Sequence, residues 1–350
     1  MNNSRFSPVC WLQFPELEHQ ITMAEQQRRL RVGYVPEHFS TPLHFAQAHY
    51  DLDAELIAFP SGTGHMVTAL RSGEIDVGIG LTEGWVAGLG KGTEAEIGDG
   101  GYRLVGTYVE TPLCTCSSHC PCRSHSNKTP GWAISTGAQR PEISTVDSLK
   151  GSRIGVSRIG SGSYVMGFVL ADERNWLLPT ATTASGATSA APFSDFVVLN
   201  TFENLRRAVN EGDADFFMWE HFTSKRYYDS GEIRRVGEIY TPWSSWKIVA
   251  STALVGADGV DKRVEDLLER LNSGIRHFNE NPEEAVKYIS TELDYSEADA
   301  REWLTTVRFP ERTQGVSPEV VERVVEILCK AGELMEREGM ASGEMIALTG

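Results

Sequence analysis

The sequence predicts an α/β protein made of two similar lobes, each with a mainly parallel sheet flanked by helices. Short apolar strands alternate with helical periods along most of the 350 residues, and this alternation is typical of parallel sheets. One pattern, a helix followed by a glycine turn and a strand that contains aspartate, occurs in both Leu70–Ile79 and Val209–Met218. Two such copies indicate two lobes rather than a tandem repeat array.

The second lobe is expected to be inserted into the first. We assign residues 23–137 and 241–350 to lobe 1 and residues 138–240 to lobe 2. Residues 1–22 show no period and are interpreted as a disordered tail, with Met23 as an alternative start. The N-terminus shows no secretory signal, because the apolar run Val9–Leu12 is too short. We therefore expect a cytoplasmic protein.

Lobe 1 begins with alternating strands and helices. The expected strands are Leu30–Val35, Leu56–Phe59, Ile75–Ile79 and Tyr102–Val109, with Trp132–Thr136 after an insert and Trp246–Ser251 as the return from lobe 2. Ser40 or Thr41 can cap a helix that carries Pro42 in its first turn. Met66 and Leu70 recur at helical spacing in the helix that follows the second strand.

Lobe 2 repeats this alternation, and the chain then ends in helices. The expected strands are Arg153–Ser157, Phe196–Leu199, Ala214–Met218 and Ile233–Tyr240, and the expected helices are Tyr164–Glu173 and Phe202–Asn210. Beyond residue 260, apolar residues such as Val264, Leu271 and Ile275 form one helical stripe, which is more typical of a core than of an interface. The sequence thus predicts a helical C-terminal part.

The charge of the chain restricts its partners. Its net charge is −16 at pH 7 with histidine neutral. Such a surface repels phosphate backbones, so we expect neither nucleic acid nor an anionic membrane as a partner. No stretch approaches the roughly 20 apolar residues of a membrane span. We therefore expect a small molecule as the partner. The composition does not indicate the oligomeric state.

Two segments interrupt the α/β pattern. Residues 114–131 are a polar, Cys-rich insert in lobe 1, and residues 180–192 are a low-complexity loop in lobe 2. The insert holds Cys114, Cys116, Cys120 and Cys122. These cysteines could bind zinc, but Cys-x-Cys is tighter than the usual Cys-x2-Cys spacing of zinc sites. We therefore favour an unstructured insert and expect no metal site.

Two polar loops are candidate ligand-binding loops. Gly62, Thr63 and Gly64 precede a helix in lobe 1, and residues 161–163 precede a helix in lobe 2. Free amides at a helix start can hold a carboxylate, a phosphate or another polar group. The alternatives, a tight glycine turn and a serine N-cap, are about as plausible. Ligands of open α/β sheets bind beyond the carboxyl ends of the strands, so two facing lobes predict a cleft.

Acidic and aromatic residues follow several strands. Glu37 and His38 come directly after the first strand and could bond a heterocycle or act as acid and base. Trp243 lies near the return to lobe 1, where it could stack a flat ligand or pack at the hinge. The candidate ligand-binding residues are Glu37, His38, Ser40, Thr41, Gly62, Thr63, Gly64, Thr82, Glu83, Ser161, Gly162, Ser163, Tyr164, Trp219, Glu220 and Trp243. No catalytic residue is assigned.

In their order and spacing these motifs resemble the type II periplasmic-binding-protein fold over roughly residues 30–340. Leu70–Gly78 in lobe 1 and Leu149–Ser157 in lobe 2 are typical of the branch that holds the SsuA-like alkanesulfonate, taurine and nitrate binding proteins and the fungal thiamine-pyrimidine synthases. Gly33–Ser40 and Tyr240–Trp246 are similar to a group of intracellular, mainly fungal homologues without a signal peptide. The resemblance implies two α/β lobes and a helical C-terminal part.

The resemblance also implies a function. It predicts an intracellular binding protein whose lobes close over a small polar ligand, either heteroaromatic and pyrimidine-like or sulfonate-like. The alternative is an enzyme on the same fold, of the thiamine-pyrimidine-synthesis or chorismate-dehydratase type. The synthases use a cysteine-rich iron motif and a lysine that binds pyridoxal phosphate, and neither occurs here in a matching context. We therefore expect no cofactor.

Overall fold

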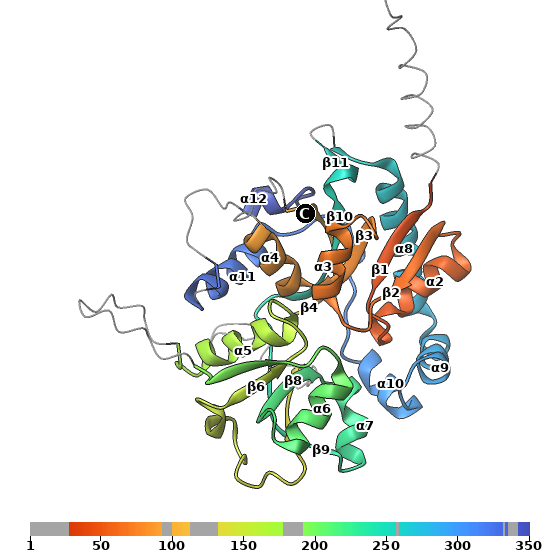
Figure 1. Ribbon diagram of the computed structural model, residues 1–350. Helices are drawn as coiled ribbons and strands as arrows, with labels where there is room; N and C mark the ends of the chain where they lie inside the picture. The colour runs from red at the N-terminus through yellow and green to blue at the C-terminus, as the bar shows by residue number, and fades with distance from the viewer. Residues whose placement is uncertain are drawn as a thin grey trace, which may run out of the picture.

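The computed structural model consists of two α/β lobes and a helical C-terminal part (Figure 1). It describes residues 28–92, 100–112, 132–177, 192–256, 259–331, 333–334 and 342–350. The expected tail (1–22), the Cys-rich insert (114–131) and all of the low-complexity loop except its last residue lie outside these ranges.

Lobe 1 contains a five-stranded sheet in which one strand runs against the others. Its order is β2 (Ala54–Ala58), β1 (Leu30–Tyr34), β3 (Val77–Leu81), β10 (Ser244–Ser251) and β4 (Tyr102–Pro112). β1 pairs in parallel with β2 and β3, whereas β10 is antiparallel to both β3 and β4. The predicted return to the first sheet is thus confirmed, with Ile248 of β10 opposite Ile79 of β3.

Lobe 2 repeats this topology. Its sheet has the order β7 (Asp195–Val198), β6 (Arg153–Val156), β8 (Phe216–Glu220), β5 (Trp132–Gly137) and β9 (Ile233–Ile239). Strand β5, which the sequence analysis assigned to lobe 1, pairs instead with β8 and β9 and is the antiparallel strand of this sheet. The expected boundary at residue 137 is therefore wrong. Apolar periodicity marks a strand without naming its partners, which long-range pairing selects.

The repeated sequence pattern has a structural cause. Oδ2 of Asp76 accepts hydrogen bonds from the backbone N–H of Arg31 at 2.9 Å and from its Nε at 3.0 Å. In lobe 2, Oδ2 of Asp215 accepts from the backbone N–H of Arg153 at 2.8 Å and from its Nε at 3.2 Å. Each aspartate follows a helix and a glycine turn, and each ties that connection to a central strand of its own sheet.

Helices cover the sheets and continue beyond them. Lobe 1 has η1 (His38–Ser40), α2 (Thr41–His49), α3 (Thr63–Arg71) and α4 (Thr82–Gly92); lobe 2 has η3 (Val146–Leu149), α5 (Gly162–Glu173), α6 (Phe202–Glu211) and α7 (His221–Asp229). After β10 come η4 (Thr252–Leu254), the hairpin β11 (Val255–Gly256) and β12 (Gly259–Val260), α8 (Lys262–Glu280), α9 (Pro282–Glu292), α10 (Glu297–Leu304), α11 (Pro318–Lys330) and α12 (Ser342–Met345). The expected stripe of α8 is buried. No helix within the described ranges is long and apolar enough to cross a membrane.

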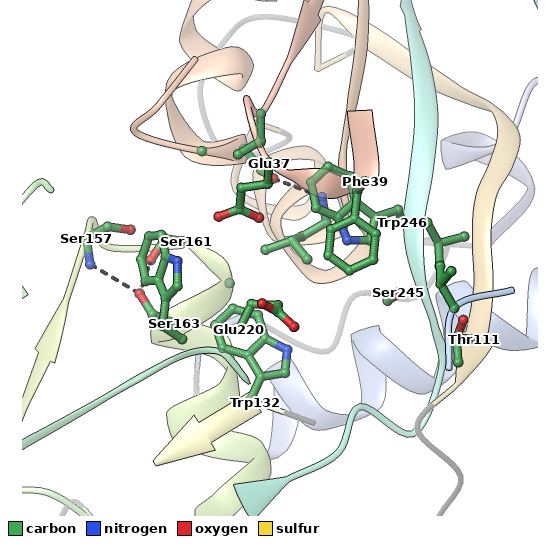
Figure 2. Close-up of a pocket in the computed structure, with 18 of the residues that line it drawn as sticks. Glu37, Phe39, Thr111, Trp132, Ser157, Ser161, Ser163, Glu220, Ser245 and Trp246 are labelled. Atoms are coloured by element: carbon green, nitrogen blue, oxygen red, sulfur yellow. Dashed lines mark hydrogen bonds between the residues drawn. The ribbon is translucent and has the colours of Figure 1, made fainter. Parts of the chain in front are cut away.

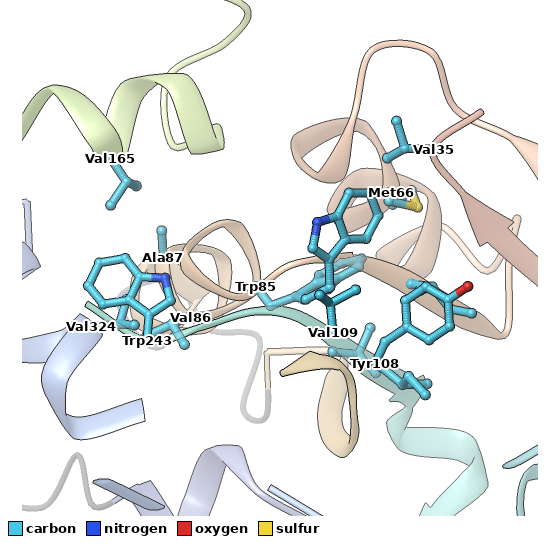
Figure 3. Packing of buried hydrophobic residues seen from close by; sticks show 14 of the residues in the cluster. Val35, Met66, Trp85, Val86, Ala87, Tyr108, Val109, Val165, Trp243 and Val324 are labelled. Carbon is cyan, nitrogen blue, oxygen red and sulfur yellow. The ribbon is translucent and has the colours of Figure 1, made fainter. Parts of the chain in front are cut away.

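The main hydrophobic core is continuous between the lobes. Val165 of α5 and Val324 of α11 belong to the same buried cluster as Val86 of α4 and Trp243 of the connection into β10 (Figure 3). A smaller cluster around Leu205 lies within lobe 2. The two lobes are therefore in contact, and the helical C-terminal part packs against this contact.

Removing an anchoring aspartate should destabilise the protein. Burial opposes ionisation of Asp215, but hydrogen bonds from Arg153 and Arg140 prevail and lower its pKa to about 2. We expect Asp215→Ala to reduce the free energy of unfolding by about 1.5–3 kcal/mol, because it removes the charged acceptor of the Arg153 backbone N–H and side chain, although Arg140 keeps Glu142 as a partner. Urea unfolding of each variant measures this.

Asp213→Ala, which removes an exposed carboxylate two residues earlier, is the matched control and should change little. A depressed carboxyl pKa stabilises the folded state above the unfolded pKa of about 4 and loses this effect as the pH falls toward 2. The difference between wild type and Asp215→Ala should therefore shrink below about pH 4. Equal unfolding midpoints for the two alanine variants at neutral pH would contradict this role.

Candidate functional site

A cavity of about 890 Å³, its mouth included, lies between the two lobes. Its walls come from segments that follow strands of both sheets, namely Glu37 and Phe39 after β1, Ser157 after β6, and Glu220 at the end of β8. Trp303 of α10 adds a wall from the helical C-terminal part. The carboxyl ends of parallel strands from both lobes thus meet at one cavity, as the sequence predicts.

Two carboxyl groups from opposite lobes point into the same space (Figure 2). Burial, reinforced by the charge of Glu220, raises the pKa of Glu37 to about 8, against the hydrogen bond of Trp219. Burial likewise raises the pKa of Glu220 to about 7, although the start of α7 donates hydrogen bonds to it. At neutral pH this pair therefore retains a proton, and the carboxyl groups remain half-buried at the cavity surface.

The first residues of α7 orient Glu220. Its Oε2 accepts from the backbone N–H of Thr223 at 2.7 Å and from the Thr223 hydroxyl at 3.1 Å, so Glu220 is the N-cap of this helix. A carboxylate at a helix N-terminus is stabilised by the free N–H groups and the helix dipole. These hydrogen bonds fix the orientation of the Glu220 side chain, which lines the cavity.

Aromatic side chains form the flat walls. Phe39 and Trp246 are stacked, with ring centroids 5.0 Å apart and planes at 29°. Trp219 is supported from behind by Phe202, with centroids 5.2 Å apart and planes at 26°. Trp132 of β5 lines the cavity from lobe 2. Such faces favour a flat ligand.

Both predicted polar loops line the cavity, and their side chains also hold local structure. In the lobe 1 loop, Gly62 adopts φ 75°, and the Thr63 hydroxyl accepts from the backbone N–H of Leu81 at 2.9 Å. In the lobe 2 loop, Ser161 is the N-cap of α5, and its Oγ lies 3.0 Å from that of Ser163. Both interpretations of these loops, a helix start and a cavity wall, thus apply to the same residues.

Half of the predicted site residues lie at the cavity. These are Glu37, Gly62, Thr63, Ser161, Gly162, Ser163, Trp219 and Glu220. The cavity lining does not include His38, Ser40, Thr41, Gly64, Thr82, Glu83, Tyr164 and Trp243. Most of the second group are bonded within the walls: Thr82 donates to the carbonyl of Ser244 at 2.6 Å, and Tyr164 donates to Glu333.

Glu83 holds the junction between the lobes. It is fully buried, and its Oε2 accepts from the indole N–H of Trp243 at 3.0 Å. Burial raises the pKa of Glu83 to about 7, against the hydrogen bonds from its own backbone N–H and Trp243. At the start of α5, a Cβ added to Gly162 would meet the end of the Leu81 side chain and lie 3.1 Å from Oε1 of Glu83. Glycine thus allows a close approach of lobe 1 to lobe 2, and a larger residue would require the Leu81 side chain to move.

His38 is buried behind the cavity in a cluster of aromatic rings. Its ring centroid lies 4.2 Å from that of Trp303 and 4.5 Å from that of Tyr295, and its Nε2 lies 3.8 Å from Oε2 of Glu220. Burial lowers its pKa well below the ordinary value, so the imidazole is neutral. Neither ring nitrogen has a hydrogen-bond partner among the described residues. His38 therefore supports Glu220 as a neutral neighbour.

Several lining residues lie outside the predicted set. They include Phe39, Thr111, Trp132, Ser157, Trp246 and Trp303. Trp246 and Trp132 adjoin the two chain crossings, and this position was the only sequence signal for them. Trp303 belongs to α10 and lies 57 positions after Trp246, the lining residue that precedes it in the sequence. Only folding brings it to the cavity.

Comparison with known proteins agrees with this architecture. The sequence model of a family described as Ca3427-like PBP matches residues 132–239. The Candida albicans CA3427 gene product, which defines a family with the generic periplasmic binding protein fold, is similar at 37% identity and a TM-score of 0.74, over 92% of this chain and 97% of that protein. No curated protein sequence matches the chain.

More distant structures share the fold alone. SsuA from Xanthomonas axonopodis pv. citri, solved with bound MOPS, is 17% identical with a TM-score of 0.65, over 90% of this chain and 97% of that one. SsuA from Escherichia coli is 15% identical with a TM-score of 0.59, over 91% and 97%. From its identity to the Candida protein over nearly the whole length of both, the chain belongs to the Ca3427-like family of proteins with the periplasmic-binding-protein fold.

Proposed function

We propose that the protein binds a small, flat ligand that is rich in hydrogen-bond donors or positively charged, and that its lobes close over this ligand. The observation that carries the proposal is the pair Glu37 and Glu220, which enters one aromatic cavity from opposite lobes. A ligand that donates to both carboxyl groups joins the lobes. Of the two ligand classes that the sequence suggests, a pyrimidine-like compound with amino groups meets this requirement.

The charge of the cavity argues against a sulfonate. None of the described residues that line it is a lysine or an arginine, and both ionisable groups in the lining are acidic. Two like charges about 4 Å apart repel by about 4 kcal/mol at an effective dielectric constant of about 20. A sulfonate, which stays ionised, would meet this repulsion, whereas an aminopyrimidine or its cation would be attracted. The SsuA proteins therefore share the fold but not this expected ligand class.

The aromatic walls support a flat ligand. A ring inserted beside the stacked pair of Phe39 and Trp246 would gain about 0.5–1.5 kcal/mol from ring contacts, beyond the area that it buries. A donor edge of the same ring can reach a carboxyl group, because Figure 2 shows Glu37 beside these aromatic side chains. Stacking on the aromatic walls then favours a flat ligand, and the carboxyl groups favour a ligand with donors or a positive charge.

Identification of the ligand tests the proposal directly. Native mass spectrometry of the purified protein should detect a bound small molecule, and extraction should recover an amine-bearing heterocycle. Isothermal titration with a 4-aminopyrimidine, with MOPS and with taurine should give measurable binding for the aminopyrimidine alone. Tighter binding of either sulfonate would refute the proposed ligand class. Recovery of the ligand unchanged after incubation favours a binding protein, whereas conversion would favour the enzyme alternative.

The cytoplasmic location expected from the sequence stays a prediction. Fluorescence microscopy of a fusion protein in the source cell tests it, with diffuse cytosolic signal as the expected result.

Neutralising either cavity carboxyl group should weaken binding. A hydrogen bond to a charged group contributes about 1.5–3 kcal/mol, so we expect Glu37→Gln and Glu220→Gln each to raise the dissociation constant by about 10- to 150-fold. Titration calorimetry with the aminopyrimidine measures this. Glu203→Gln, in the first turn of α6 and on the outside of lobe 2, is the matched control and should bind as wild type does. Unchanged affinity in both cavity variants would exclude this role.

The raised pKa values predict opposite effects of pH on stability and on binding. Between the ordinary pKa of 4.5 and the raised pKa of about 8, Glu37 binds more protons in the folded state than in the unfolded chain. The stability of the unliganded protein should therefore fall as the pH rises through this interval. A ligand with a permanent positive charge, such as an N-methylated aminopyrimidinium, should bind at least about tenfold more tightly at pH 9 than at pH 6, because Glu37 is ionised only at the higher pH.

Thermal unfolding of the protein with and without this probe, measured across this pH range, checks both the fall in stability and the rise in affinity. In Glu37→Gln the fall in stability between pH 7 and pH 9 should be smaller than in wild type. Affinity that is independent of pH would show that the carboxyl groups do not contact the probe.

A further inference from the structure

A cluster of metal-ligating side chains lies away from the cavity, where three helices of lobe 1 and the C-terminal part meet. It consists of His49 at the end of α2, His277 in the last turn of α8, and Glu284 in the first turn of α9. Nε2 of His49 lies 3.0 Å from Oε1 of Glu284, and Nε2 of His277 lies 2.9 Å from Oε2. One carboxylate thus bridges two imidazoles that come from distant parts of the sequence.

The spacing suits a transition-metal ion. One ligand atom from each of the three residues can be chosen so that all lie within 4.8 Å of one another. In a tetrahedral zinc site with bonds of about 2.0–2.1 Å, neighbouring ligand atoms are about 3.3 Å apart. The observed separations between nitrogen and oxygen are slightly shorter, so a small outward movement would admit an ion. Two histidines and a carboxylate, with water in the fourth position, are a known ligand set for zinc.

Neighbouring groups hold the cluster in position. The Tyr50 hydroxyl lies 3.1 Å from Nδ1 of His277, and Phe45 contacts the same imidazole edge-on with centroids 5.1 Å apart. A hydrogen bond to the second nitrogen of a metal-bound histidine fixes its ring and raises its affinity for the ion. The hydrogen bond from His277 also lowers the pKa of Glu284, so its carboxylate is ionised and available as a ligand.

The ring of His49 can adjust to an ion. It stacks on His277 with centroids 4.3 Å apart and planes at 14°, which brings the two rings side by side. Its side chain is 39% exposed at the helix end, whereas that of His277 is 16% exposed. Because a metal binds in the plane of each imidazole, the exposed ring must turn so that both lone pairs converge. The less exposed ring of His277 would keep its present position.

We propose that His49, His277 and Glu284 form a binding site for a divalent transition-metal ion of the zinc class. The ion would take the lone pair of each Nε2, with each imidazole neutral and its proton on Nδ1, where that of His277 can donate to the Tyr50 hydroxyl; a ring that begins protonated on both nitrogens releases one proton to solvent, and water completes the coordination. The bound ion joins the end of α2 to α8 and α9, the helices that precede the cavity residue Trp303 in the chain. Its expected role is structural, and it is independent of the ligand proposed for the cavity.

The cysteines of the insert require a separate background for the test. Cys114, Cys116, Cys120 and Cys122 lie outside the described residues and can bind zinc themselves. Measurements are therefore made on the full chain with these four cysteines replaced by serine. Cobalt(II) distinguishes the remaining sites, because thiolate ligands give charge-transfer absorption in the near ultraviolet, whereas a site of imidazole and carboxylate gives only visible d–d bands.

Equilibrium dialysis with zinc followed by elemental analysis should show one bound ion in this background. We expect His277→Ala and Glu284→Gln each to bind zinc at least tenfold more weakly, and Tyr50→Phe to weaken binding about tenfold through the lost hydrogen bond. Zinc should also raise the midpoint of thermal unfolding by a few degrees in the background protein and not in His277→Ala. Magnesium, which prefers oxygen ligands, should have neither effect.

Glu283→Gln is the matched control. Glu283 precedes the proposed ligand, is exposed, and pairs with Arg301 rather than with a histidine. It should bind zinc as the background protein does. The proposal is overturned if the background protein binds no zinc, or if His277→Ala and Glu284→Gln retain its stoichiometry and affinity. His49→Ala, which removes an exposed side chain at the end of α2, provides the same comparison if His277→Ala or Glu284→Gln impairs folding.

Discussion

The cleft depends on how the chain completes its two sheets. Each sheet contains a single antiparallel strand, β10 in lobe 1 and β5 in lobe 2, and each of these strands is the first to enter its sheet after the chain crosses between lobes. The remaining strands of each sheet run in one direction. Their carboxyl ends therefore meet in the space between the lobes, which is where loops of open α/β sheets bind ligands. Glu37 and Glu220 face each other because of this topology.

Burial makes ionisation of the cavity carboxyl groups costly. Burial raises the pKa values of Glu37, Glu220 and the nearby Glu83, so each of them resists losing its proton. Perturbed carboxyl groups in a cleft are typical of functional sites. A cationic or donor-rich ligand would offset this cost at the first two residues. Glu83 is different, because its partner is Trp243 and its effect is to join α4 to the connection between the lobes.

The helical C-terminal part forms one wall of the cavity and contacts lobe 2. Trp303 of α10 lies between the cavity and the buried His38, and Tyr295 donates or accepts a hydrogen bond with Thr223 of α7 in lobe 2 at 3.0 Å. Lys225 of α7 pairs with Asp299 of α10 at 3.2 Å. These helices thus contact both lobes. The cluster at the start of α9 lies on the same helical segment, so an ion bound there would stiffen the support of the cavity wall.

Sequence alone determined the features that local chemistry specifies. Strand and helix periods, the repeated motif that carries Asp76 and Asp215, and the loops that end in Glu37, Ser161 and Glu220 all follow from residue type and spacing over short stretches. Tertiary structure decided the rest, because pairing and burial depend on residues far apart in the chain. In the structure, β5 pairs within the sheet of lobe 2, and Glu83 and His38 lie outside the cavity lining. Trp303, which the sequence did not indicate, belongs to this lining. Tertiary structure also assembled His49, His277 and Glu284, where the sequence predicted no metal site, since no local spacing relates residues more than 200 positions apart.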